Sequence, residues 1–80
     1  MERSEILKHI NDIFKDTLDN EEVVVLENTT ANDIEEWDSL SHIQLVVAIE
    51  KHFKIRFTSK EILSWNDVSE MMNCIQEKGV

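Results

Sequence analysis

The feature that most limits how this chain can fold is its lack of helix-breaking residues. It has no proline, and its only glycine, Gly79, is the second-last residue. Proline and glycine are the strongest local breaks in a helical pattern. We therefore expect an all-α fold, with helices wherever apolar residues recur at helical spacing.

Two segments show that spacing most clearly. In the first, apolar residues recur every three or four positions, as on one face of an amphipathic helix: Ile6, Leu7, Ile10, Ile13, Phe14 and Leu18. Ser4 is the expected N-cap of this helix. A second helix is expected to begin at Asp38-Ser39, because both residues are good N-caps. Its predicted core stripe contains Ile43, Val46, Ile49 and Phe53.

Capping patterns predict two more helices. Thr58 and Glu61 are spaced as a capping box, which predicts a short helical turn through Ile62 and Leu63. Asp67, with Glu70 three residues later, predicts the start of the last helix. The inner face of that helix is expected to contain Val68, Met71, Met72 and Ile75. The prediction is a small antiparallel four-helix bundle, with three longer helices and one short one.

The stretch from Asp19 to Trp37 is rich in Asn, Asp and Thr, which favour turns and caps, and we expect a long first loop there. Within it, Val23–Leu26 has the composition of a short strand. No second strand is available to pair with it, so we favour a buried anchor of the loop. Val24, Leu26 and Ile34 are expected to close one side of the bundle.

The size and charge of the chain exclude several classes of function. Eighty residues suit one domain, residues 1–80, with a modest core and no room for a deep catalytic cleft. The formal net charge of −9 argues against nucleic acid and anionic membranes as partners and favours basic protein surfaces. We expect a monomer.

Three absences together fit a cytoplasmic protein. The sequence has no apolar run long enough to span a membrane. The N-terminus lacks the basic and apolar blocks of a signal peptide. The only cysteine, Cys74, has no partner for an internal disulfide and is interpreted as an ordinary helix residue.

The sharpest local motif is Trp37-Asp38-Ser39-Leu40. In the first turn of a helix, the hydroxyl of Ser39 would point away from the core. The unsatisfied N–H groups and the helix dipole would favour a phosphate ester on that oxygen, although the charge of Asp38 opposes it. On these residues alone, Asp38 and Ser39 are more simply explained as helix caps.

A wider pattern changes that balance, because Thr29 through Phe57 resembles the acyl carrier protein family. The resemblance rests on Asp38-Ser39-Leu40 at the head of a helix, followed by Ile43, Leu45, Val46, Ala48, Ile49, Glu50, Phe53, Ile55 and Phe57. Chain length, acidity and the order of the helices extend the resemblance to nearly the whole chain.

The resemblance implies a carrier that is not itself an enzyme. A phosphopantetheinyl transferase would move a 4'-phosphopantetheine arm from coenzyme A onto the serine matching Ser39. Asp38 matches the aspartate associated with the magnesium-dependent transfer. The thiol of the arm would hold an acyl or aminoacyl group as a thioester, and acyl-loading and acyl-transferring enzymes would make and break the bonds.

The sequence departs from the fatty-acid members of the family. Glu36 and Trp37 stand where those members have glycine, and the second helix is less acidic because of Ser41, His42, Gln44 and Lys51. This favours a dedicated carrier in a specialised pathway for lipids, polyketides or aminoacyl groups. The expected partner surface contains Leu40, Ser41, Gln44, Val47, Glu50 and Lys51.

Other interpretations are possible for some of these residues. The competing class is an acidic helical interaction domain without a prosthetic group. A hydrolase built on Ser39, His42 and Asp38 would need an oxyanion hole and a glycine-containing nucleophile elbow, which the sequence lacks. The three histidines have no metal-ligand spacing, and we expect them on the surface: His9, His42 and His52. Trp37 and Trp65 either cover helix ends or lie along the path of the arm and its cargo.

Overall fold

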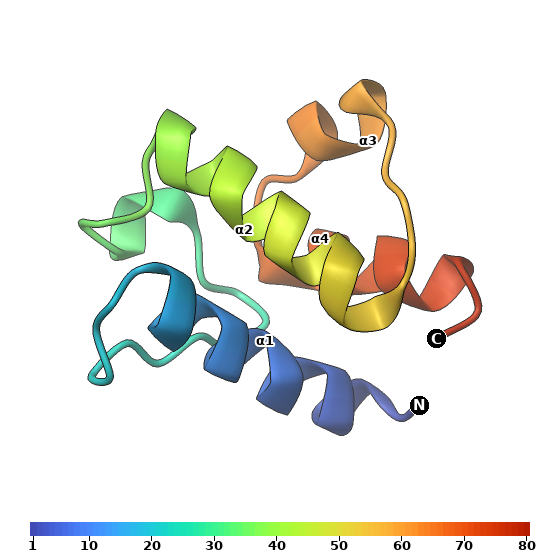
Figure 1. Ribbon diagram of the computed structural model, residues 1–80, viewed down its shortest axis with the longest axis horizontal. Coiled ribbons are helices and arrows are strands. Elements are labelled where there is room, and N and C mark those ends of the chain that lie inside the picture. The colour runs from blue at the N-terminus through green and yellow to red at the C-terminus, as the bar shows by residue number, and fades with distance from the viewer.

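The computed structural model describes all 80 residues as four α-helices without a strand. The elements are α1 (Arg3–Thr17), α2 (Ser39–Phe53), α3 (Ser59–Ser64) and α4 (Val68–Glu77), with a 3-10 turn, η1, at Ala31–Asp33 in the long first loop. α1 and α2 run in opposite directions, and α4 packs against α1 (Figure 1). The expected helical bundle with one short helix is confirmed. No helix has both the length and the apolar character that a membrane crossing requires.

The core forms where the two predicted amphipathic faces of α1 and α4 meet. Both faces are buried as expected, and they contribute Ile6, Ile10, Ile13 and Phe14 from α1 and Val68, Met71, Met72 and Ile75 from α4. The third wall comes from α2, which buries Leu45, Val46 and Ile49. Phe53 lies partly buried against this core.

One residue of the predicted α2 stripe was placed wrongly. Ile43 is 61% exposed. It shares a row with Leu40 and Val47, because residues three and four apart lie on the same side of a helix. That row faces away from Leu45 and Ile49, so Ile43 belongs to the outer surface of α2.

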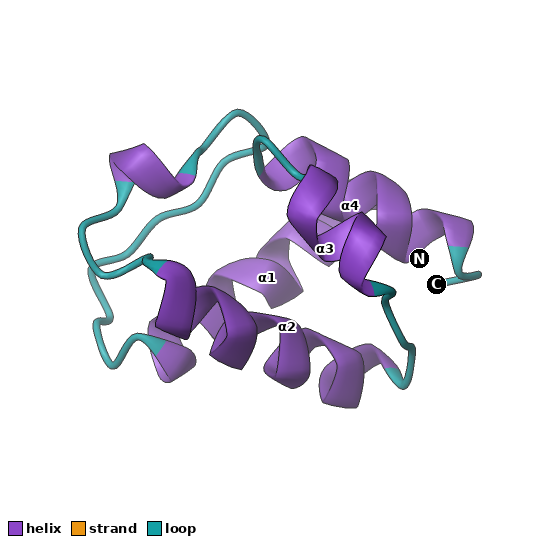
Figure 2. Ribbon diagram, turned by 90° about the horizontal axis from the view of Figure 1, so that it is seen from above, coloured by secondary structure: helices purple, strands orange, loops and turns teal.

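The long first loop contains the η1 turn (Figure 2), and its Val23–Leu26 segment lies without helix between two other turns. Val23 and Val25 are buried, whereas Val24 is 67% exposed and Leu26 is also exposed. The expectation that Val24 and Leu26 close the bundle was therefore wrong, since successive side chains of an extended chain point to opposite sides. Ile34 does pack, partly buried, against the core.

An asparagine of α1 takes the place of a partner strand for this loop. The Asn11 side-chain amide donates from Nδ2 to the Val25 carbonyl at 2.8 Å, and its Oδ1 accepts from the Val25 N–H at 2.7 Å. Both backbone groups of Val25 are thus satisfied without a sheet. The loop then supplies the carbonyls of Thr29 and Glu27 to the N–H groups of Val68 and Ser69, which begin α4.

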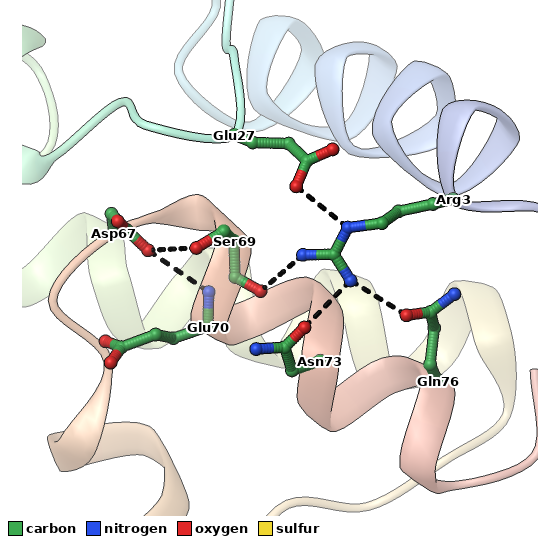
Figure 3. A network of polar contacts seen from close by, with 7 residues as sticks. All are labelled: Arg3, Glu27, Asp67, Ser69, Glu70, Asn73 and Gln76. Atoms are coloured by element: carbon green, nitrogen blue, oxygen red, sulfur yellow. Dashed lines mark hydrogen bonds and ion pairs between the residues drawn. The ribbon is translucent and has the colours of Figure 1, made fainter.

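A single arginine ties three segments together (Figure 3). The Arg3 guanidinium pairs with the Glu27 carboxylate of the loop at 2.8 Å. It also donates to the Ser69 carbonyl at 3.0 Å and to the side chains of Asn73 and Gln76, each at 2.8 Å. The start of α1 is therefore fixed to the loop and to α4 through one side chain.

Two of the three predicted caps outside α2 form. Thr58 and Glu61 close the expected capping box, and the Asp67 carboxylate accepts from the Glu70 N–H at 3.1 Å. The Glu70 carboxylate bonds the Asn66 N–H, so no reciprocal bond reaches Asp67. The expectation for Ser4 was wrong, because α1 begins earlier, with Glu2 at the N-cap position.

Candidate functional site

Ser39 is the first residue of α2, and it plays no part in capping that helix. The Asp38 carboxylate accepts from the Ser41 N–H at 2.9 Å, while the Asp38 N–H donates to the Ser41 hydroxyl at 2.8 Å. Asp38 and Ser41 thus close the capping box between them. Ser39 is exposed, and its hydroxyl has no hydrogen-bond partner in the chain. The fold therefore presents one unengaged serine hydroxyl at the head of α2.

Asp38 adds a negative charge next to that hydroxyl. Its bond from the Ser41 N–H is the main reason that the pKa of Asp38 lies below its ordinary value of 3.8, and the Ser41 hydroxyl and the Leu40 N–H act in the same direction. Asp38 is therefore ionised at neutral pH. Only Oδ1 is used in the cap, so Oδ2 has no partner in the chain.

Ser41 corrects one prediction for the partner surface. It is only 8% exposed, and its hydroxyl donates to the Glu36 carbonyl at 2.7 Å while it accepts from Asp38. Its side chain is occupied in fixing the turn before α2, so Ser41 presents no surface to a partner. Ser39 and Ser41 have separate environments, although only Leu40 stands between them.

Ser39 lies on the rim of an open groove of about 500 Å³ between α2 and α3. Five of its eight lining residues are hydrophobic, and the complete lining is Ala31, Trp37, Asp38, Ser39, His42, Ile43, Ile62 and Leu63. Leu63 is 83% exposed. An apolar surface of this kind, next to an unbonded hydroxyl, can hold a flexible and partly apolar group.

Aromatic rings form the inner wall at this end of α2. Trp37 is buried with its ring edge-on to Phe14, and its indole N–H donates to His42 Nδ1 at 3.1 Å. Trp65 meets His42 edge-on and donates its own N–H to the Cys74 sulfur at 3.1 Å. Trp37 both covers the core and lines the groove, whereas Trp65 is not part of the lining. Cys74 is a half-buried helix residue, as expected.

The histidines are more engaged than the sequence suggested. His42 is half-buried against Trp37, and His9 Nδ1 lies 3.0 Å from His52 Nε2, which joins α1 to the end of α2. No His, Cys, Asp or Glu side chains gather in a group that could hold a metal ion. No hydrogen bond joins Ser39 to His42, so the triad geometry of a hydrolase is not formed.

The outer face of α2 carries a row of exposed apolar residues. Leu40, Ile43 and Val47 follow one another at spacings of three and four, and Gln44 and Lys51 are exposed next to them. Glu50 is partly buried, because its carboxylate accepts from the Phe57 N–H at 2.8 Å. The sequence reasoning missed Ile43 and Leu63 on this side of the molecule, although the spacing of Ile43 from Leu40 and Val47 was a usable signal.

Comparison with known proteins explains this arrangement. A family model described as "Phosphopantetheine attachment site" matches residues 35–75. The chain belongs to this family of phosphopantetheine-binding acyl carrier proteins. It is 29% identical over 77 residues to an acyl carrier protein of Coprothermobacter proteolyticus, a match that covers 95% of this chain and 93% of that one. Its fold matches the solution NMR structure of a holo acyl carrier protein from Geobacter metallireducens with a TM-score of 0.84 and 36% identity, over 90% of this chain and 83% of that chain.

Family membership makes this carrier a non-catalytic protein with covalent phosphopantetheine as its cofactor. The residues at the head of α2 fit that group. The Ser39 hydroxyl is available for a phosphate ester, and Ser39 lines a mostly apolar groove.

Proposed function

We propose that Ser39 is the attachment residue and that this acyl carrier protein holds an acyl or aminoacyl group there for a specialised biosynthetic pathway. The observation that supports this most directly is the unengaged hydroxyl of Ser39 on the rim of the apolar groove. Phosphopantetheine supplies a terminal thiol, which carries the group as a thioester. Ser39 contributes the oxygen of the phosphate ester.

Asp38 assists the transfer of the phosphopantetheine arm to Ser39 and has no part in holding the acyl group. Its carboxylate is ionised, and Oδ2 is left over after capping. Carboxylate oxygens are ligands that magnesium accepts readily. We propose that Asp38 meets the magnesium ion of the transferase reaction through Oδ2, while Oδ1 keeps the helix capped.

The attachment site is tested by intact mass after incubation with coenzyme A, magnesium and a promiscuous phosphopantetheinyl transferase. We expect wild type to gain one phosphopantetheine and Ser39→Ala to gain none. Ser59→Ala is the matched control, because Ser59 is also an exposed serine that begins a helix behind a closed capping box. A mass gain that persists in Ser39→Ala would place the attachment elsewhere.

The outer face of α2 is the surface that we propose for the partner enzymes. These are the transferase and the enzymes that load and remove the cargo, all of which must approach the Ser39 end of the helix. The apolar row of Leu40, Ile43 and Val47 leads away from that end, with Gln44, Glu50 and Lys51 at its sides. Exposed apolar rows next to a reactive site are suited to docking.

Val47→Glu tests this surface. We expect reduced turnover by a dedicated partner enzyme, with folding and mass gain unchanged. Val24→Glu is the control, since Val24 is an exposed valine on the first loop rather than on α2. Equal turnover for wild type and Val47→Glu, both fully loaded, would exclude Val47 from the partner surface.

The positive charges near the end of α2 favour a specialised pathway over general fatty-acid synthesis. Lys51, Lys54 and Arg56 are exposed along the end of α2 and the turn that follows, and none of them forms an ion pair. Docking by charge depends on complementary surfaces, so this face is a poor match for enzymes that recognise strongly acidic carriers. We expect slow turnover by generic fatty-acid synthase enzymes and faster turnover when these three residues are replaced by glutamate. No gain in the triple variant would argue against charge as the basis of selection.

A further inference from the structure

His42 lines the groove, and one of its ring nitrogens bonds a buried residue, Trp37. His42 stands three residues after Ser39 on α2, a spacing that puts side chains about 5–6 Å apart at Cβ. Both residues line the same groove. His42 is therefore close to the point where an arm on Ser39 begins.

The fold selects one tautomer of His42. An indole N–H is only a donor, so the bond from Trp37 requires His42 Nδ1 to be the acceptor. Trp37 cannot easily turn away, because it is buried and packed edge-on against Phe14 with ring centroids 5.0 Å apart. The neutral imidazole consequently carries its proton on Nε2.

That Nε2–H is available for a ligand. It has no partner in the chain, and no buried side-chain nitrogen or oxygen lacks a partner, so Nε2 is not fully buried. The other polar groups of the lining are Ser39 itself and the carboxylate of Asp38, which only accepts. His42, a residue of this mostly apolar lining, thus has a donor that no group of the chain occupies.

We propose that His42 is a positioning residue whose Nε2–H donates a hydrogen bond to a phosphate oxygen of the arm on Ser39. This inference rests on the proposed attachment at Ser39. Only the first part of an arm lies within reach of a residue one helical turn away, and its phosphate oxygens are the strongest acceptors there. The charge of Asp38 repels the phosphate, so a donor on the groove side directs the arm into the groove.

The test uses the full-length holo protein, with a ¹⁵N-labelled arm introduced from labelled coenzyme A. Wild type is compared with His42→Leu, which removes the donor, and with His42→Gln, whose side-chain N–H can replace Nε2–H. His52→Gln is the control, since His52 is a histidine at the other end of α2. Intact mass first confirms complete loading of each protein.

We expect the ³¹P resonance of His42→Leu to differ from that of wild type. We also expect the arm amide nearest the phosphate to show a lower ¹⁵N heteronuclear NOE, because the arm is less restrained. His42→Gln should restore both signals toward wild type, and His52→Gln should match wild type. Because the amide oxygen of glutamine could also accept the Trp37 N–H, the apo-to-holo movement of the His42 Nε2 resonance in wild type is measured as well, since a merely structural role would not produce it.

Identical ³¹P resonances and arm relaxation in fully loaded wild type and His42→Leu would overturn the proposal. If His42→Leu does not fold, the ¹⁵N resonance of His42 Nε2 in wild type decides the question. We expect it to move between the apo and holo forms, and no movement would also overturn the proposal. Failure of the attachment proposal is distinguishable, since the mass gain would then survive in Ser39→Ala.

Discussion

The α1–α4 side of the molecule and the α2–α3 side are built differently. On the first side, the apolar faces of two helices are sealed in the core, and Arg3 makes four polar contacts that join them to the first loop. On the second side, α3 buries no residue, and Leu40, Ile43 and Leu63 are exposed. The most deeply buried residues thus lie away from Ser39, and the apolar surface near Ser39 is the surface that we propose for the arm and its partners.

The short helix α3 buries no residue fully, and a few contacts join it and its flanking residues to α4 and the end of the chain. Lys78 pairs with Glu61 at 3.2 Å and lies 5.5 Å from the ring centroid of Phe57. Trp65, just after α3, bonds the Cys74 sulfur. Segments with few buried contacts are the first to open locally, so we expect the groove wall formed by α3 to move more readily than the wall formed by α2.

The largest predicted effect comes from truncating one apolar side chain on each of the two sides, the first buried and the second exposed. Met71→Ala removes a fully buried side chain, so we expect a loss of about 2–5 kcal/mol in the free energy of unfolding. Leu63→Ala removes an exposed side chain of α3, and we expect a change within about 0.5 kcal/mol. Urea unfolding measures both. Similar losses in the two variants would contradict the contrast between the two sides.

The next effect concerns Arg3. Its side chain is partly exposed, which weakens the Glu27 pair, but its other contacts include two side-chain amides and a carbonyl. We expect Arg3→Ala to lose about 1–2 kcal/mol of stability in urea unfolding. Arg3→Lys should recover little, because an ammonium cannot reproduce the planar fork. Arg56→Ala is the control, as Arg56 is exposed and forms no ion pair; a similar loss there would argue against a special role for Arg3.

The sequence predicted the structure correctly where residues within one element determine it. The inner faces of α1 and α4 follow from helical periodicity alone, and the capping box of Thr58 and Glu61 is local in the chain. The head of α2 was located for the same reason, since Asp38 is a good cap by its own chemistry. These patterns fix which residues face inward, or where a helix starts, without knowledge of the rest of the fold.

The predictions failed where contacts with residues distant in the sequence determine which side chain is buried. Val25 rather than Val24 is buried because Asn11, in another element, holds the Val25 backbone. Ile43 was assigned to the core because the sequence gives spacing but not which of two apolar rows of α2 meets α1. The Trp37–His42 hydrogen bond could not be predicted from the sequence either, since it depends on how Trp37 packs against Phe14.

A smaller effect is expected from acid, at the Ser39 end of α2. The pKa of Asp38 is lowered in the folded protein, so its stabilising contribution is present above its ordinary pKa of 3.8 and is lost as the pH falls through the lower folded value. Asp38→Asn keeps a cap without this titration. The stability difference between wild type and Asp38→Asn should therefore shrink over roughly pH 5 to 2, measured by urea unfolding. Glu61 and Asp67, whose pKa values are also lowered, are common to both proteins and cancel. A constant difference would mean that Asp38 caps equally well when protonated.

The smallest effect on stability should come from Ser39 itself. Ser39 is exposed and unbonded, so Ser39→Ala should change the free energy of unfolding by no more than about 0.5 kcal/mol. Ser41→Ala removes a nearly buried hydroxyl that bonds Glu36 and Asp38, and we expect a loss of about 1–2 kcal/mol. Urea unfolding and intact mass, applied to both variants, separate the two roles. We expect Ser41→Ala to be less stable yet still able to gain phosphopantetheine, and Ser39→Ala to be stable yet unable to gain it. Marked unfolding of Ser39→Ala would show that Ser39 supports the fold, and the division between a stabilising serine and a modified one would then be wrong.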